Sequence, residues 1–138
     1  MRYYLDTSML FFILSRREDE INPKILTILN NYSTILYTSS IAVKELLLLF
    51  RIGKFKYPKY KFEKEIMDDI QKLHIEIVFF NQYHLETYTS LQIVDGHKDM
   101  NDHAIISQAI SDKIPVISSD TKFFDYANQG LKFIHNKR

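Results

Sequence analysis

The sequence predicts an α/β fold, a three-layer α/β/α sandwich with a central parallel sheet. Short apolar segments rich in β-branched and aromatic residues alternate with longer helical segments along the whole chain. No linker and no internal repeat divides it, so residues 1–138 are expected to form one domain. Strands that are joined through helices need right-handed crossovers, and such strands lie parallel with helices on both faces of the sheet.

The elements follow from local pattern. The strand at residues 2–5 is apolar and is expected at the centre of the sheet. Asn22-Pro23 begins a helix, because the missing N–H of proline costs little in a first turn. The expected strands are residues 2–5, 34–37, 75–80, 115–118 and 131–134. The expected helices are residues 7–15, 22–31, 41–52, 61–73, 82–94 and 99–113, with a short helix from Thr121.

Composition excludes several classes of protein. At 46% hydrophobic residues and with no cysteine, the chain can bury a core but has neither a disulfide framework nor a thiolate metal site. Its apolar runs are too short for a membrane span and it shows no leader pattern, so we expect a cytoplasmic protein without membrane contact. The net charge of +1 means that any nucleic-acid contact must come from local clusters of lysine and arginine.

Two aspartates follow predicted strands directly. Asp6 comes after residues 2–5, and Asp120 comes after residues 115–118. The carboxyl ends of parallel strands share one edge of the sheet, which is where ligands bind in such folds. Asp6 alone also fits the role of a helix cap, so its meaning depends on which other residues reach this edge.

Two further acids lie on apolar helix faces. At about 100° per residue, Glu45 falls in the middle of an apolar face of helix 41–52, and Asp102 falls on the apolar stripe of helix 99–113. A buried carboxylate must be neutral, paired with a cation or bound to a metal ion. The apolar neighbours are Ile41, Ala42, Leu48, Leu49 and Ile52 for Glu45, and Ile105, Ile106, Ala109 and Ile110 for Asp102.

All four carboxylates are expected at the same sheet edge, with no lysine or arginine on the same inward faces. Like charges so close together raise one another's pKa values, and a divalent cation removes the conflict. Oxygen ligands favour Mg²⁺ or Mn²⁺ over zinc. The sequence therefore predicts a magnesium or manganese site.

These segments resemble the PIN-domain nucleases, most closely the single-domain VapC-type toxins. The resemblance covers nearly the whole chain and rests on LDTS around Asp6, SSIAVKELL around Glu45, DMNDHAIISQA around Asp102 and VISSD around Asp120. It implies an α/β/α sandwich, dependence on Mg²⁺ or Mn²⁺ and endonucleolytic cleavage of RNA. It also implies a homodimer and a small antitoxin that covers the acidic site.

The resemblance assigns the four acids to the acidic quartet of the family and places Ser118 where the family often has Ser or Thr. His103 departs from the pattern, because an arginine commonly follows the third acid. For metal-assisted phosphodiester hydrolysis we expect Asp6 and Asp102 to bind the ion directly. Glu45 and Asp120 are expected to bind through water or to complete a second metal site, and Ser118 to orient a water or an acid.

A basic segment is the candidate contact for RNA. In residues 51–64 cations alternate with aromatic residues, which suits single-stranded RNA because cations follow phosphates and rings stack on bases. The equally weighted alternative is a surface loop whose aromatic residues pack into the core. The predicted RNA-binding residues are Lys54, Lys56 and Lys59, with Arg16 and Lys122 as weaker candidates.

Three expectations complete the prediction. Helix 41–52 is apolar nearly all round, and its second surface is expected to be an interface in a homodimer or with an antitoxin. Asp99 is expected to cap a helix, and His97 and His103 to lie on the surface or behind the acids. The second apolar surface of helix 41–52 consists of Val43, Leu46, Leu47 and Phe50.

Two other functions stay open: a housekeeping RNA-processing nuclease and a PIN module that binds RNA or protein without catalysis.

Overall fold

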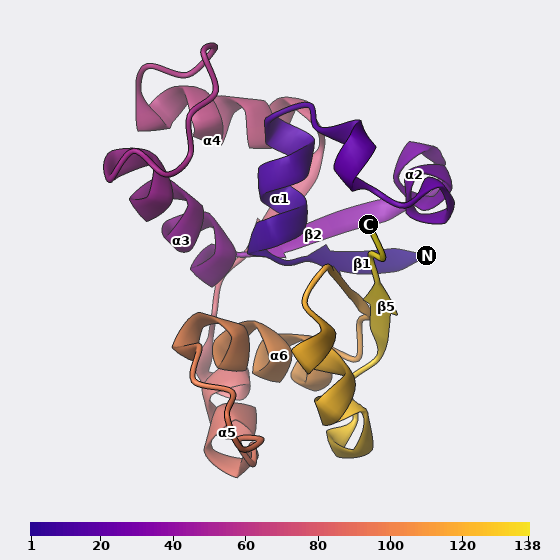
Figure 1. Cartoon of the computed structure of the whole chain (residues 1–138). Coiled ribbons are helices and arrows are strands. Elements are labelled where there is room, and N and C mark those ends of the chain that lie inside the picture. Colours follow the sequence, from indigo (N-terminus) through magenta and orange to yellow (C-terminus); the bar gives the residue numbers. More distant parts are fainter.

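The structure is a computed structural model that describes residues 1–138. Five parallel strands form the central sheet in the order β3-β2-β1-β4-β5, and helices cover both of its faces (Figure 1). The predicted α/β/α sandwich is confirmed, with the first strand at its centre. The strands are β1 (Arg2–Leu5), β2 (Ile35–Ser39), β3 (Ile75–Val78), β4 (Val116–Ser118) and β5 (Phe133–His135).

Each predicted helix is present, although two differ from the expectation. Helix α5 ends at Ser90 rather than at Val94, and the segment from Thr121 is a long 3₁₀ helix. None of the helices is both long and apolar enough to cross a membrane. The helices are α1 (Thr7–Leu14), η1 (Glu18–Glu20), α2 (Pro23–Asn30), α3 (Ser40–Arg51), α4 (Glu63–Lys72), α5 (Gln82–Ser90), α6 (Met100–Asp112) and η2 (Thr121–Gln129).

Strand β1 supplies side chains to two separate cores. Tyr3 and Leu5 pack into a cluster that also holds residues of α1, α2 and α4, whereas Tyr4 packs into a second cluster with residues of α6 and η2. Successive side chains of a strand point to opposite faces, so a buried strand contributes to both layers. This double burial explains why the strand has no polar face.

Helix α3 corrects the prediction of which face is buried. Ala42, Val43 and Leu46 are in the core, while Leu48 and Ile52 are more than half exposed at 53% and 56%. The surface predicted as an interface is therefore partly core, and part of the predicted inner face is open. Because α3 is apolar nearly all round, its sequence has no periodicity that predicts which face is buried. The buried face is determined by packing against α1 and α6.

The topology creates one natural site. Strand β1 pairs with β2 on one side and with β4 on the other, with Leu5 opposite both Thr38 and Ile117. The chain leaves β1 toward β2 and returns later to β4, so the strand order reverses at β1. Crevices outside the carboxyl ends of strands at such a reversal are where ligands bind in open α/β sheets.

Candidate active site

Asp6 lies at the end of β1 and is only 4% exposed. It also caps α1, because Oδ1 accepts hydrogen bonds from the Met9 backbone N–H (3.0 Å) and the Ser8 hydroxyl (2.7 Å), while Oδ2 accepts one from Ser118. Burial raises the pKa of Asp6 from 3.8 to about 6, although these hydrogen bonds oppose the shift. The cap expected for a lone aspartate is present, yet it leaves a carboxylate whose ionisation is unfavourable.

Asp102 lies in the first turn of α6 and is 9% exposed. Burial, followed by the charges of the neighbouring carboxylates Asp99, Asp6, Asp120 and Glu45, raises the pKa of its carboxyl group from 3.8 to about 8. Asp99 caps α6 as predicted, since its Oδ1 accepts from the backbone N–H groups of Asn101 and Asp102. The acids thus influence one another electrostatically at this edge.

Glu45 is partly buried on α3 and is held by two hydrogen bonds. The Thr7 hydroxyl donates to Oε1, and the Asn101 side-chain amide donates to Oε2 over 3.0 Å. These contacts join the starts of α1 and α6 to the middle of α3. Neither Thr7 nor Asn101 was predicted as a site residue, although both flank predicted acids in the sequence.

Ser118 connects the two strand-end acids. It is fully buried, donates to Asp6 Oδ2, and accepts a hydrogen bond from the Asp120 backbone N–H over 3.0 Å. The Asp120 carboxylate in turn caps η2 through the Lys122 backbone N–H (2.9 Å). Of the two roles predicted for Ser118, orienting an acid is the one that this contact supports.

One cleft brings the four predicted acids together. It has a volume of about 310 Å³. No lysine or arginine forms an ion pair with any of the four acids. Asp6 and Asp102 are buried oxygen donors with raised pKa values, and an acidic cleft of this kind without a cationic partner fits a hard divalent cation such as Mg²⁺ or Mn²⁺. The residues that line the cleft are Asp6, Thr7, Ser8, Phe11, Phe12, Glu45, Leu49, Asp99, Asp102 and Asp120.

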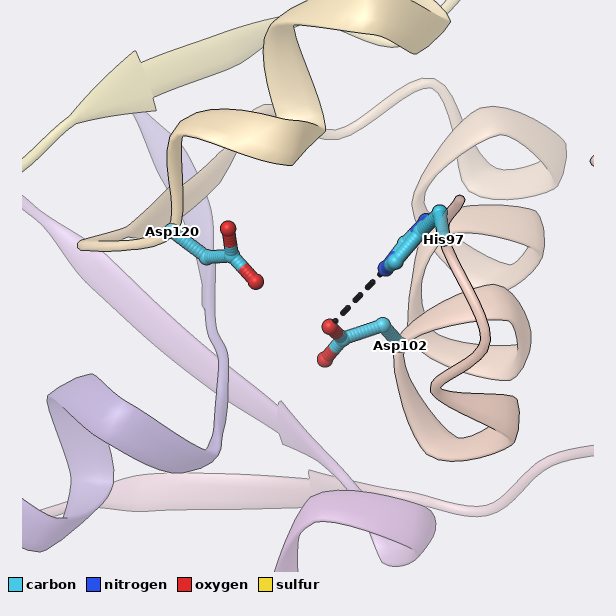
Figure 2. A group of neighbouring side chains, drawn as sticks. All are labelled: His97, Asp102 and Asp120. Carbon is cyan, nitrogen blue, oxygen red and sulfur yellow. Dashed lines mark hydrogen bonds and ion pairs between the residues drawn. The ribbon is translucent and has the colours of Figure 1, made fainter. Parts of the chain in front are cut away.

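His97 is a buried member of the site rather than a surface residue. Its Nε2 lies 3.2 Å from Asp102 Oδ2, and the Asp102 and Asp120 carboxylates face each other across a gap beside it (Figure 2). Burial and then the charge of His103 lower the pKa of His97, which favours the neutral imidazole. His103 is also buried, at 5% exposure, so it does not stand on the surface where a phosphate would bind.

The basic residues lie outside this cleft. In the segment after α3, the rings of Phe55 and Tyr60 are buried, which fits the packing alternative, while Phe62 is 70% exposed. Lys59 forms an ion pair of 2.8 Å with Asp69, whereas Lys54 is exposed and has no ion pair. RNA binding by this segment stays a prediction, and its aromatic contribution is smaller than the sequence suggested.

The remaining RNA-binding candidates differ in their distance from the acids. Lys122 is exposed and lies two residues after Asp120, next to the cleft. Arg16 follows the other end of α1 from Asp6, which at 1.5 Å per residue places it roughly 12 Å or more along the helix axis. Arg16 lines an apolar cavity instead.

The comparison with known families agrees with this geometry. The model of the PIN domain family matches residues 3–129, which include all four acids. The chain belongs to the PIN domain family. The membership predicted from four short sequence motifs is therefore confirmed. No curated protein matches this PIN domain significantly.

Solved structures share the fold of this PIN domain over nearly its whole length. A chain of VapBC2 from Rickettsia felis, bound to a promoter DNA fragment, has a TM-score of 0.68 at 21% identity and covers 98% of both chains. A chain of DNA-bound VapBC from Salmonella typhimurium has a TM-score of 0.67 at 16% identity over 98% of both chains. A chain of VapBC-1 from nontypeable Haemophilus influenzae reaches 0.64 at 19% identity over 100% of both. At these identities the likeness concerns the fold.

Proposed function

We propose that this PIN domain is a metal-dependent endoribonuclease that hydrolyses RNA phosphodiester bonds, and that it is the toxin of a type II toxin–antitoxin system. The observation that carries the nuclease proposal is the cleft with four carboxylates, from four separate parts of the chain, that no lysine or arginine neutralises. Family membership supports the same chemistry. Burying several carboxylates together is unfavourable, and a cation-dependent reaction gives this arrangement a purpose.

In the proposed mechanism Asp6 and Asp102 would hold Mg²⁺ or Mn²⁺ directly, and Glu45 and Asp120 would bind it through water or complete a second site. Such an ion would supply an acidified water molecule and positive charge for the phosphate oxygens. Ser118 keeps the Asp6 carboxylate in position, and no side chain of the protein serves as the nucleophile.

RNA is the proposed substrate, and exposed lysines are its proposed contacts. Lys122 stands next to Asp120 and is suited to a phosphate close to the cleft. Lys54 and Lys56 are exposed on the loop that follows α3 and would bind the strand further away. Lys59 is engaged with Asp69 and contributes less.

The test is incubation of purified protein with single-stranded RNA in EDTA, Mg²⁺ or Mn²⁺, beside Asp102→Asn. We expect cleavage only with the metal ions, and a loss of roughly 100-fold or more in the variant, because a missing ligand costs more than a missing outer contact. The exposed Asp125 gives a matched control, Asp125→Asn, that should cleave at the wild-type rate. Equal cleavage by Asp102→Asn, or cleavage in EDTA, would refute the proposal.

The toxin assignment is supported by the neighbours, which are named as VapBC complexes. As the family resemblance implies, we propose that a small antitoxin covers the acidic cleft itself. Leu48 of α3 and the adjoining Ile52 are both exposed and offer an apolar surface for a second copy of the chain in a homodimer.

Expression of the chain alone separates a toxin from the two alternatives. A toxin arrests growth, and Asp102→Asn relieves the arrest. A housekeeping RNA-processing nuclease cleaves RNA in the assay above without arresting growth, and a binding module does neither. A small overlapping reading frame upstream of the gene would further support the antitoxin partner.

A further inference from the structure

A buried tyrosine hydroxyl determines the protonation pattern beside Asp102. Tyr126, on η2, is 0% exposed, and its hydroxyl oxygen has two hydrogen-bond contacts: the Val94 backbone N–H at 3.1 Å and His97 Nδ1 at 2.7 Å. A backbone N–H only donates, so the tyrosine oxygen is the acceptor in the first contact. The tyrosine proton therefore has one available acceptor, His97 Nδ1.

This contact assigns the tautomer of His97. With Nδ1 acting as an acceptor, the single proton of the neutral imidazole sits on Nε2. Nε2 faces Asp102 Oδ2 at 3.2 Å, so it donates to the carboxylate. The chain of donors therefore runs in one direction, from Tyr126 through His97 to Asp102.

The loop that carries His97 is fixed to α6 and η2. His103 Nε2 contacts the His97 carbonyl oxygen at 3.0 Å, and the His97 N–H donates to Val94 at 3.0 Å. The His97 ring packs edge to face against the His103 ring, with centroids 4.6 Å apart, and against the Tyr126 ring at 5.4 Å. The imidazole therefore has little freedom to rotate away from Asp102.

A different role for His97 is suggested by spacing alone. His97, Asp102 and Asp120 each place one ligand atom within 4.8 Å of the others, as in a metal site with a histidine ligand. A ligating Nε2 carries no proton, which moves the proton to Nδ1. The hydroxyl proton of Tyr126 then has no acceptor in a fully buried position, and native structures avoid this arrangement.

We propose that Tyr126 and His97 form a positioning pair for Asp102, in which His97 donates to one carboxylate oxygen and leaves the other for the cation. The inference deepens the proposed nuclease function and rests on its cation site. His97 is then a positioning residue and not a metal ligand. Hydrogen bonds of this kind orient ligands and strengthen metal binding by about 10- to 100-fold.

The first test needs no metal ion. Nitrogen-15 NMR of the histidine side chains in the metal-free protein should show His97 protonated on Nε2, and Tyr126→Phe should reduce the population of that tautomer. Tyr60→Phe is a matched control, because Tyr60 is also buried and bonds a carboxylate, Asp69, away from the site. A wild-type His97 that is protonated on Nδ1 would overturn the inference, whatever the protein does to RNA.

The second test measures Mg²⁺ affinity by calorimetry. His97→Ala should weaken binding by about 10- to 100-fold, whereas His97→Gln keeps an N–H that reaches Asp102 and should stay within about threefold of wild type. His84→Gln is the matched control, since His84 is equally buried and pairs with Asp112 at the far end of α6. An equal loss in His97→Gln and His97→Ala, or no loss in His97→Ala, would overturn the inference.

A third measurement separates the two roles directly. Pulsed electron paramagnetic resonance of bound Mn²⁺ should show no directly coordinated histidine nitrogen, and a coordinated nitrogen would make His97 a ligand. Failure of the nuclease proposal has a different signature. In that case the tautomer is as expected and Mg²⁺ binds, but RNA is not cleaved in either metal ion.

Discussion

Asp6→Asn removes the charge of a buried carboxylate while keeping an oxygen that accepts the hydrogen bond from Met9. The pKa of Asp6 rises from 3.8 to about 6 on folding, mainly through burial. One pKa unit corresponds to about 1.4 kcal/mol, so an ionised Asp6 lowers the free energy of unfolding by about 3 kcal/mol above pH 7. The pKa of Asp6 is higher in the folded state than in the unfolded state. The contribution of Asp6 to the free energy of unfolding is therefore fully present below about pH 4 and is lost as the pH rises through about 6.

In the absence of divalent ions, the variant should therefore be more stable than the wild type at pH 8, by up to about 3 kcal/mol. For a chain of this length, that difference corresponds to about 10 °C in Tm. The two proteins should approach equal stability at pH 4. Mg²⁺ at one thousand times its Kd should reverse the order at pH 8, because it stabilises only the wild type, by about 4.1 kcal/mol.

The assay is thermal unfolding followed by circular dichroism, at pH 4 and pH 8, with EDTA or with Mg²⁺. Asp125→Asn serves as the control, because Asp125 is exposed and should show neither effect. If Asp6→Asn is less stable than the wild type at pH 8 in EDTA, the electrostatic reasoning fails. If the variant still gains stability from Mg²⁺, Asp6 is not a ligand.

Three further predictions concern protons, RNA and assembly. Apparent Mg²⁺ affinity, measured by calorimetry, should rise between about pH 6 and pH 8, because Asp102, whose pKa is about 8, loses its proton over this range. An affinity that does not change with pH would argue against Asp102 as a ligand. The double variant Lys54→Ala, Lys56→Ala should weaken RNA binding and lower the slope of log K against log salt by roughly 1.4, and an unchanged slope would remove both residues from the interface. Leu48→Asp with Ile52→Asp should convert a dimer into a monomer in analytical ultracentrifugation, whereas an unchanged sedimentation coefficient would place the interface elsewhere.

The sequence predicted the sheet and the four acids because both follow from local patterns. Asp6 and Asp120 come directly after strands, and parallel topology alone brings such residues to one edge. Asp102 interrupts a clear apolar stripe, which marks it as unusual wherever the helix packs. These signals need no knowledge of which partner each residue meets.

Other features depend on contacts between distant parts of the chain, which no local pattern contains. The exposed side of α3 at Leu48 was predicted as buried, because every face of that helix is apolar. Helix α5 was predicted to continue to Val94, but that residue instead packs in the second core cluster and donates to Tyr126. The same loop carries His97, whose role depends on Tyr126, a partner 29 residues away.

The central claim is that the four acidic side chains hold a divalent cation. Anomalous diffraction from a crystal soaked in Mn²⁺ tests it most directly, because the manganese positions are then located without reference to activity. We predict one or two peaks in the cleft, with carboxylate oxygens of Asp6 and Asp102 as ligands. A cleft without a peak, or manganese bound only elsewhere on the protein, would contradict the claim.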